Sequence, residues 1–133
     1  MKKLRGFGFM LLISLLLFCV TACQREESNT PSYEQITAKE AKTIMDSEEN
    51  YIIMDARTLE EYDEGHIEGA VCFPYADVKA KAHVVLPEKD KQILVYCRSG
   101  RRSKIAAETL CELGYINVKE FGGIIDWPYE VVK

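Results

Sequence analysis

The sequence predicts an α/β fold that is built on a largely parallel β-sheet. Short β-rich apolar runs alternate along the chain with segments of helical spacing, as they do when helices connect parallel strands. The clearest example is residues 92–103, QILVYCRSGRRS, in which an apolar strand leads into a tight cationic loop and the start of a helix. Ligands of such sheets bind at the carboxyl ends of the strands. Cys97, at the end of this run, therefore marks the candidate site.

The other elements follow in chain order from the same two periodicities. Strands are expected at residues 33–36, 51–54, 71–74, 93–97 and 117–121. Helices are expected at residues 38–47, 59–62, 77–82 and 103–113. Thr37 and Glu40 match a capping box that would start the first of these helices. Gly122 and Gly123 predict a turn after the last strand, followed by an apolar closing segment at residues 124–127.

The first 22 residues predict an export signal that is not part of the fold. Three cationic residues precede an apolar run at residues 7–20, which is too short for a comfortable membrane span. The segment VTAC at residues 20–23 resembles the lipobox of bacterial lipoproteins, so we expect cleavage after residue 22 and a lipid on Cys23. Two acyl chains would anchor the protein stably to a membrane. We expect an exported protein on the extracytoplasmic face of the cell membrane; an uncleaved signal anchor or a plain secreted protein are the alternatives.

The expected mature chain is acidic. Residues 1–22 hold three of the 17 Lys and Arg residues and none of the 21 Asp and Glu residues, so their removal changes the net charge from −4 to −7. This balance argues against nucleic acid as a partner. After Cys23, the polar residues up to 32 have no apolar periodicity and predict a flexible tether. The folded domain is then expected over residues 33–133.

Cys97 is expected to be a nucleophile. A thiol at the carboxyl end of a strand faces the N-terminus of the next helix, where backbone N–H groups and the helix dipole stabilise anions. Arg98, Arg101 and Arg102 add positive charge, so the thiolate should be favoured relative to a free cysteine, whose pKa is about 8.5. Gly100 allows a positive φ, which would let successive N–H groups turn towards the sulfur. The alternative is a buried structural cysteine beside solvated arginines.

Three segments resemble motifs of the rhodanese sulfurtransferases, in the order and at the spacing of that family. They are residues 97–103 with Ala106, Ala107 and Leu110; residues 55–57, 61–62 and 65–70; and residues 121–124 with Trp127. Together they cover almost the whole chain from residue 33 to residue 127. The resemblance implies a rhodanese-like α/β fold with a mainly parallel five-stranded sheet and helices on both faces. The chain lacks the glycine that often follows the tryptophan in this family, which would shorten the last helix and leaves the oligomeric state and the edge packing of the sheet open.

The resemblance also implies a reaction. Cys97 would attack the outer sulfur of an anionic donor such as thiosulfate, hold it as a persulfide and pass it to cyanide or a thiol acceptor. No cofactor is implied. Backbone N–H groups of the loop would stabilise the anionic sulfur, and Arg98 would be the side chain best placed to bind the donor. The expected substrate-binding residues are Arg98, Ser99, Gly100, Arg101, Arg102 and Ser103.

The polar residues of the upstream motif are expected to support this loop. Arg57 would pair with a nearby carboxylate such as Glu61 or Asp55. His66 is expected to hold its turn by hydrogen bonds, because a low-pKa thiolate needs no base partner. No Cys or His pair has the spacing of zinc ligands, so no metal site is expected. Cys72 and Cys111 are expected in the core, with a disulfide as the less favoured alternative.

Two other functions fit parts of the pattern. Phosphatases and arsenate reductases of related folds also hold a cysteine thiolate in an N–H cradle, but they keep five residues between the cysteine and the phosphate-binding arginine. Here four residues separate Cys97 from Arg102, and Ser103 occupies the phosphatase position. The second alternative is a membrane-tethered carrier or binding module, whose persulfide or bare thiol serves a partner such as a redox or sulfur-relay protein. The sequence does not separate such a carrier from an enzyme with independent turnover.

Overall fold

The computed structural model describes residues 32–133 of the chain. The expected signal peptide at residues 1–22, the expected lipidation site Cys23 and the tether up to residue 31 lie outside the described residues. Within residues 32–133, no helix has both the length and the apolar character needed to cross a membrane.

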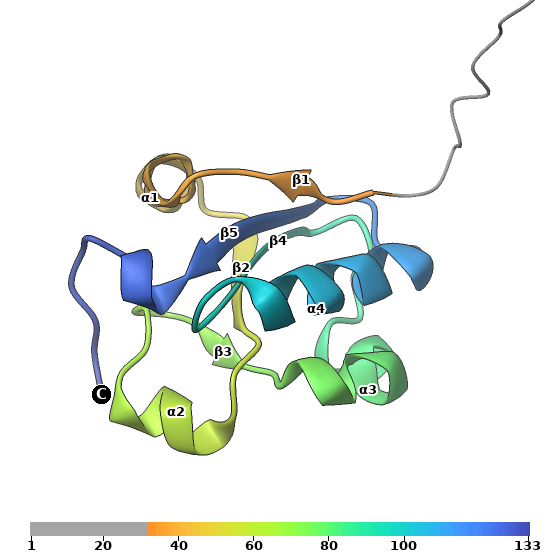
Figure 1. Cartoon of the computed structure of the whole chain (residues 1–133). Coiled ribbons are helices and arrows are strands. Elements are labelled where there is room, and N and C mark those ends of the chain that lie inside the picture. The colour runs from red at the N-terminus through yellow and green to blue at the C-terminus, as the bar shows by residue number, and fades with distance from the viewer. Residues whose placement is uncertain (1–31) are drawn as a thin grey trace, which may run out of the picture.

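Five strands form one sheet in which every neighbouring pair is parallel. The strands are β1 (Glu34–Gln35), β2 (Tyr51–Asp55), β3 (Val71–Cys72), β4 (Gln92–Cys97) and β5 (Val118–Gly123), and their order across the sheet is β1-β5-β4-β2-β3. Figure 1 shows β4 in the middle of this arrangement, with β5 on one side and β2 on the other. The predicted α/β class and the five-stranded parallel sheet are confirmed.

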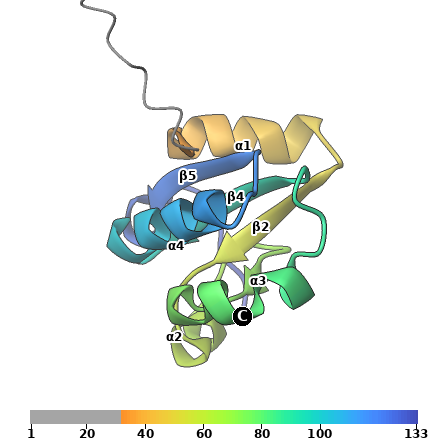
Figure 2. The same cartoon turned by 90° about the vertical axis from the view of Figure 1, so that its right-hand side faces the viewer.

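Helices cover both faces of the sheet, as expected. They are α1 (Ala38–Ser47), α2 (Leu59–Glu64), α3 (Val78–Val85) and α4 (Arg101–Glu112), with short 3₁₀ turns at Tyr75–Asp77 and Ile124–Asp126. Figure 2 shows α1 above the sheet and α3 and α4 below it. The predicted capping box starts α1: the Thr37 hydroxyl accepts from the Glu40 N–H, and the Glu40 carboxylate accepts from the Thr37 N–H.

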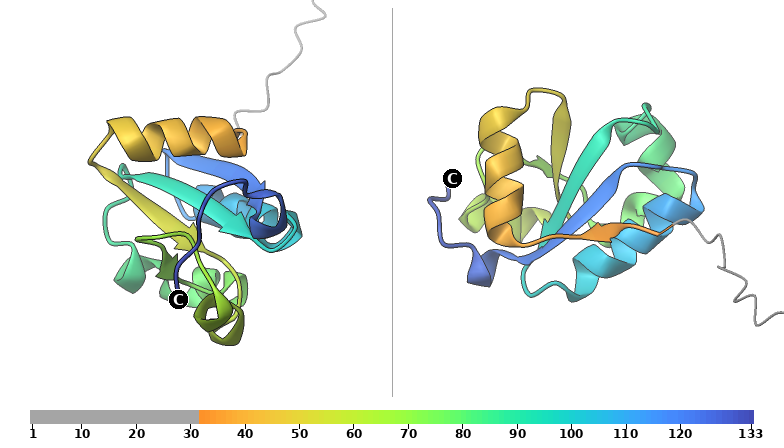
Figure 3. Two further views of the ribbon diagram at one scale, coloured as in Figure 1. Left: turned by 90° about the vertical axis from the view of Figure 1, so that its left-hand side faces the viewer. Right: turned by 90° about the horizontal axis from the view of Figure 1, so that it is seen from above.

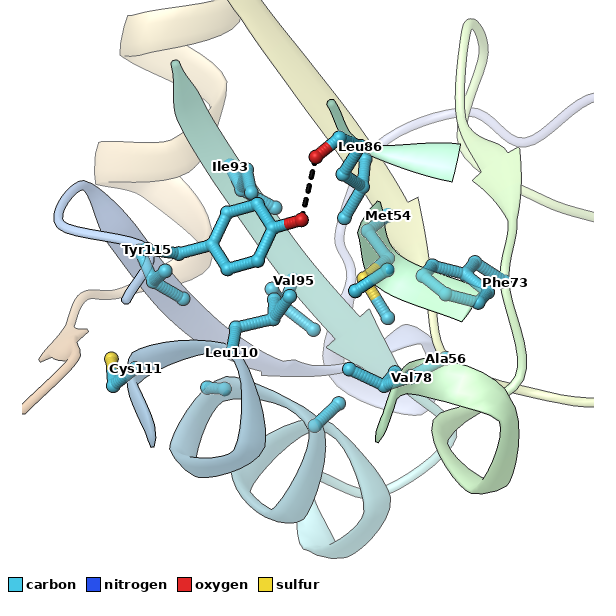
Figure 4. Packing of buried hydrophobic residues seen from close by; sticks show 14 of the residues in the cluster. Met54, Ala56, Phe73, Val78, Leu86, Ile93, Val95, Leu110, Cys111 and Tyr115 are labelled. Atoms are coloured by element: carbon cyan, nitrogen blue, oxygen red, sulfur yellow. Dashed lines mark hydrogen bonds between the residues drawn. The ribbon is translucent and has the colours of Figure 1, made fainter. Parts of the chain in front are cut away.

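The face of the sheet under α3 and α4 holds the larger apolar core (Figure 4). Side chains of β4, α3 and α4 meet there and exclude water completely, as the zero exposure of Ile93, Val95 and Leu110 shows. Tyr115 is also buried in this core, and its hydroxyl donates to the Leu86 carbonyl over 2.6 Å. This hydrogen bond removes most of the free-energy cost of burying the Tyr115 hydroxyl. The core fixes β4, and therefore the position at which Cys97 leaves the sheet.

Two predicted boundaries beside the site are wrong. Helix α4 begins at Arg101 and not at Ser103, because Gly100 takes the left-handed conformation (φ 97°) and the chain turns directly into the helix. The expected turn at Gly122 and Gly123 is the end of β5, because Cys97 pairs with Gly123 after a shift in register that follows Val95. Both changes bring the cysteine loop closer to β5 than the sequence indicated.

The C-terminal segment returns to the side of the molecule that carries α2 (Figure 3). Val132 forms an antiparallel bridge with His66, with N–H to carbonyl distances of 2.8 and 2.9 Å. The segment therefore lies beside the turn that follows α2.

Candidate active site

Cys97 occupies the last position of the central strand β4 and is 1% exposed. The strand is buried on both faces from Ile93 onwards, so it holds the cysteine in a fixed place. Next to it begins α4, whose first turn points its free N–H groups towards this end of the sheet. The site thus has the strand, loop and helix arrangement that the sequence predicted.

A backbone N–H group of the loop binds the Cys97 sulfur. The Gly100 N–H donates to the Cys97 sulfur over 3.0 Å. Gly100 can do so because its φ of 97° turns the peptide inwards, a conformation that costs glycine little and other residues more. This contact is the beginning of the anion cradle that was expected at this loop.

The pKa of the Cys97 thiol is lowered from its ordinary value. Burial alone would raise it, but hydrogen bonds from the Ser103 hydroxyl and the N–H groups of Ser103, Gly100 and Ser99 stabilise the thiolate more than burial opposes it. Hydrogen bonds to Glu61, opposed by partial burial, raise the pKa of the Arg102 guanidinium, and the charges of Glu61 and Cys97 raise it further. The loop therefore favours the reactive, ionised form of the cysteine.

Gly123 lets the cysteine loop approach β5. A Cβ atom at this position would lie 2.0 Å from the Arg98 carbonyl oxygen and 2.6 Å from the Ser99 Cα. No side chain fits at such distances, so glycine is required here by space. The absent side chain allows the loop backbone to pack directly against the end of β5.

A buried network ties β2 to β4 beneath the loop. Asp55 is fully buried, and its Oδ2 atom accepts from the Arg57 Nη2 and the Tyr96 hydroxyl, each over 2.7 Å, and from the Arg57 Nε over 3.1 Å. Arg57 also donates through its Nη2 to the Gly65 carbonyl over 2.7 Å. The Tyr96 hydroxyl in turn accepts from the Ile67 N–H over 3.1 Å. Of the two expected partners of Arg57, the structure selects Asp55.

Glu61 pairs with Arg102 instead. Two hydrogen bonds of 2.7 Å join the guanidinium to the two carboxylate oxygens, which is the bidentate geometry of a strong ion pair. The Arg102 hydrogen bonds, opposed by partial burial, lower the pKa of Glu61 to about 2. Glu61 also forms a capping box with Thr58 at the start of α2. This pair therefore fastens α2 to the first turn of α4.

Arg98 and Arg101 differ from the other two arginines. Both are exposed, and within residues 32–133 neither takes part in an ion pair. Arg98 lines a cavity of about 340 Å³ together with Arg57, Glu61, Glu64, Gly65, Ile124, Ile125 and Val131. The cavity brings the upstream motif, the cysteine loop and the C-terminal segment to one place. Arg98 is the lining cation that has no carboxylate partner among these residues.

His66 lies in the turn after α2. Its Nδ1 is 2.9 Å from the Tyr62 carbonyl, and its ring stacks on the Tyr62 ring at a centroid distance of 3.6 Å. The His66 backbone also forms the bridge with Val132, so the ring nitrogen, the ring face and the backbone of His66 each have a contact. These contacts agree with a role in holding the turn.

The sequence analysis missed Glu120, which is completely buried beside the cysteine loop. Its Oε1 accepts from the Ser103 hydroxyl over 2.6 Å and from the Gly122 N–H over 2.8 Å. Strand alternation could have found it, because Glu120 shares a strand face with the buried Val118. Tyr96 was also missed, since it appears in the sequence as one more apolar residue of β4.

The other two described cysteines, Cys72 and Cys111, differ from Cys97 in how their surroundings affect the thiolate. Cys72, half-buried on β3, and Cys111, buried in the core under α4, are free thiols, as is Cys97. Burial raises the pKa of Cys111, and burial followed by the Asp55 charge raises that of Cys72. The cysteine of the cradle is thus the one whose thiolate is favoured among the described cysteines.

Comparison with known proteins decides the family. The family model described as "Rhodanese-like domain" matches residues 37–128. The chain belongs to the rhodanese-like domain family. The match spans every element from α1 to the second 3₁₀ turn, including the upstream motif that contains Arg57 and the cysteine loop.

Curated relatives and solved structures agree with this assignment. The chain is 38% identical over 80 residues to the thiosulfate sulfurtransferase PspE of Escherichia coli K12, covering 60% of this chain and 77% of that protein. It is 37% identical over 107 residues to the putative sulfur carrier protein YrkF of Bacillus subtilis, covering 78% of this chain and just 56% of that protein. A structure titled "rhodanese with anions from E. coli" superposes with a TM-score of 0.58 at 36% identity, covering 62% of this chain and 98% of the other.

Proposed function

We propose that this protein is a sulfurtransferase that carries sulfane sulfur as a persulfide on Cys97. The Cys97 thiolate attacks the outer sulfur of a donor such as thiosulfate; a bond between the two sulfurs forms, and sulfite leaves with the electron pair of the broken bond. Cyanide or a thiolate then attacks the outer sulfur of the persulfide, and Cys97 leaves again as the thiolate. Covalent capture divides one transfer into two easier displacements.

One observation supports this reaction more than any other: a buried sulfur that accepts a hydrogen bond from the Gly100 N–H over 3.0 Å. Each step of the reaction leaves negative charge on a sulfur atom at this position. Preorganised N–H donors stabilise such charge without having to reorient during the reaction. The lowered pKa of Cys97 is the same effect expressed in the resting protein.

The donor would bind in the cavity of about 340 Å³ in front of the loop. Arg98 is exposed there and offers a planar guanidinium to the oxyanion end of a sulfonate-like donor. Arg102 would contribute less to donor binding than expected from the sequence, because Glu61 already accepts two of its hydrogen bonds. Thiosulfate fits this arrangement as a small anion with a transferable outer sulfur, and it is the substrate named for the relative PspE.

Turnover with thiosulfate and cyanide tests the proposal. The purified protein is expected to form thiocyanate, and Cys97→Ser should abolish the reaction while far-UV circular dichroism stays unchanged. Cys111→Ser is the matched control, because it alters a buried thiol outside the cradle and should leave turnover in place. If Cys97→Ser remains as active as Cys111→Ser, Cys97 is not the reacting residue.

An aryl phosphate serves as the probe for the phosphatase alternative, and its hydrolysis would contradict the proposal.

A carrier function is the second candidate, and the relative YrkF supports it through its name as a putative sulfur carrier. A carrier would accept sulfur on Cys97 but release it only to a protein thiol. Single-turnover loading with slow release to cyanide and fast release to a dithiol acceptor would favour the carrier. Equal release to both acceptors would favour an enzyme with small-molecule substrates.

We also propose that Cys23 carries a lipid and holds the domain on the extracytoplasmic face of the membrane. The support is the VTAC segment after a short apolar run, both in the part of the chain outside residues 32–133. Cys23→Ala should move the full-length protein from the membrane fraction to the soluble fraction. A variant that stays in the membrane fraction would contradict lipid anchoring through this residue.

A further inference from the structure

A second cavity lies between α1 and the C-terminal segment. Its volume is about 790 Å³, within the range of about 300 to 1,000 Å³ that is typical of small-molecule sites. Lys42, Met45 and Asp46 of α1 form one wall, and residues 127–130 form the opposite wall. Figure 3 shows these two segments on the same side of the molecule. The cavity shares no lining residue with the cavity in front of the cysteine loop, the donor cavity, so the proposed reaction does not use it.

The cavity has an apolar floor and aromatic walls. Ile53 and Ile67 line it, and both are buried and belong to the core on the α1 face of the sheet. Three aromatic rings also line the cavity, those of Tyr51, Trp127 and Tyr129. Such a lining favours a ligand with an apolar or aromatic body.

Contacts among the lining residues hold the rings in place. The Trp127 ring packs against Phe121 at a centroid distance of 5.6 Å and meets Tyr129 edge-on at 4.9 Å. The Tyr51 hydroxyl donates to the Met45 carbonyl over 2.9 Å and so ties β2 to α1. A ligand would therefore enter a cavity whose walls are already ordered, which reduces the cost of binding.

A cation of the protein itself already contacts this aromatic wall. The Lys42 ammonium group lies over the Tyr129 ring, 5.6 Å from its centroid, which is within reach of a cation–π interaction. The same ammonium group forms an ion pair with Asp46, one turn along α1. An ammonium group at this wall thus contacts an aromatic face and a carboxylate at the same time.

The charged groups around the cavity are mostly acidic. Among the described residues that line it, Asp46, Glu68 and Glu130 are carboxylates and Lys42 is the one cation. Lys42 compensates Asp46, whereas Glu68 and Glu130 take part in no ion pair within residues 32–133. This charge balance attracts a cation and repels an anion. It also disfavours a second copy of the chain, whose net charge is −4.

We propose that this cavity binds an organic cation, a small molecule that has an ammonium group and an aromatic or aliphatic body. The body lies on the apolar floor formed by Ile53 and Ile67. The ammonium group lies at the rim, where it contacts the Tyr129 ring and is attracted by the carboxylates of Glu68 and Glu130. Lys42 then competes with the ligand, because its own ammonium group already contacts Tyr129.

The lining contains its own reporter. Trp127 is the single tryptophan of the chain, so its indole N–H gives one signal in the ¹H–¹⁵N NMR spectrum of the full-length protein. The test follows this signal during titration with phenethylamine, phenylacetamide and phenylacetate. These probes have similar bodies and carry a positive charge, no charge and a negative charge, respectively.

Phenethylamine should shift the indole signal with a Kd of about 1 mM, as expected for so small a ligand. It should bind about fivefold more tightly than phenylacetamide, and phenylacetate should bind most weakly. The proposal is overturned if phenethylamine causes no shift, if phenylacetamide binds equally well, or if phenylacetate binds more tightly. All three results come from wild type and need no variant to fold.

Lys42→Met tests the competition. It removes the ammonium group that contacts Tyr129 and keeps a long apolar side chain, so phenethylamine should bind about threefold more tightly. Lys39→Met is the matched control, because it makes the same change in charge at an exposed residue of α1 outside the lining, and it should bind like wild type. Weaker binding to Lys42→Met would overturn the proposal, since a site that selects anions would show it.

A second variant tests the aromatic wall. Tyr129→Leu keeps an apolar side chain at an exposed position but removes the ring, so phenethylamine should bind about threefold more weakly while phenylacetamide changes less. An equal loss for both probes would contradict a cation–π contact at Tyr129.

Competition with thiosulfate locates the probe. Thiosulfate should not displace phenethylamine, and Cys97→Ser should bind phenethylamine like wild type, because the two cavities have no lining residue in common. Displacement by thiosulfate would place the probe in the donor cavity and overturn the proposal. The inference does not depend on sulfur transfer, so it and the proposed function can fail separately.

Discussion

The arginines around Cys97 form two pairs that differ in what they contact. Arg57 and Arg102 each face a carboxylate in bidentate geometry and join elements of the fold to one another. Arg98 and Arg101 are exposed and have no ion-pair partner within residues 32–133. The sequence suggests one dense cationic loop, whereas a donor would meet only part of that charge. The first pair should therefore determine stability, and donor binding should depend on Arg98 of the second pair, which lines the cavity.

The strongest way to break this division is to remove the carboxylate beneath Arg57. Asp55→Ala should lower the free energy of unfolding by about 3 to 5 kcal/mol, because it leaves the guanidinium buried and without its partner. Urea denaturation followed by circular dichroism measures the change. A loss below about 1 kcal/mol would show that the Arg57 network is not structural.

Arg98→Ala should weaken donor binding and leave the stability of the fold almost unchanged. The KM for thiosulfate is expected to rise about tenfold, since Arg98 is the cavity cation that has no ion-pair partner within residues 32–133. The free energy of unfolding should stay within about 0.5 kcal/mol. Arg98→Lys is the matched control: it keeps the charge but loses the planar fork, and should restore only part of the affinity. An unchanged KM in Arg98→Ala would place donor binding elsewhere.

Glu61→Gln is expected to have a smaller effect that depends on pH. At neutral pH it should lower the free energy of unfolding by about 1 kcal/mol, because the pair with Arg102 is only partly buried. The pKa of Glu61 is depressed to about 2 from 4.5, so the pair stabilises the fold above pH 4.5 and loses this contribution as the pH falls towards 2. The wild-type and variant stabilities should therefore converge in acid. A difference that is constant with pH would contradict the ion-pair explanation.

Arg101→Ala should change least of all. The residue is exposed, has no ion pair within residues 32–133 and does not line the cavity in front of the loop. We expect a KM within about twofold of wild type and a free energy of unfolding within about 0.5 kcal/mol. A tenfold rise in KM would show that the donor contacts both exposed arginines.

The fold and the reactive cysteine could be predicted because both depend on local patterns. The apolar run before Cys97, the glycine at position 100 and the helical spacing after it are contiguous, and each has a direct physical meaning. The capping box at Thr37 and Glu40 is equally local, and it is confirmed.

Long-range partners could not be predicted in the same way. Glu61 and Arg102 are 41 positions apart, as are Asp55 and Tyr96, and only the sheet order brings each pair together. Gly123 is required by the approach of the Arg98 backbone, which no pattern near Gly123 reveals.

The mass of the protein after treatment with thiosulfate tests the central claim most directly. Intact-mass spectrometry should show a gain of about 32 Da, the mass of one sulfur, which peptide mapping places on Cys97 and which cyanide removes as thiocyanate. Cys97→Ser should gain nothing. A wild-type protein with no added sulfur, or a variant that still acquires it, would contradict a persulfide on Cys97.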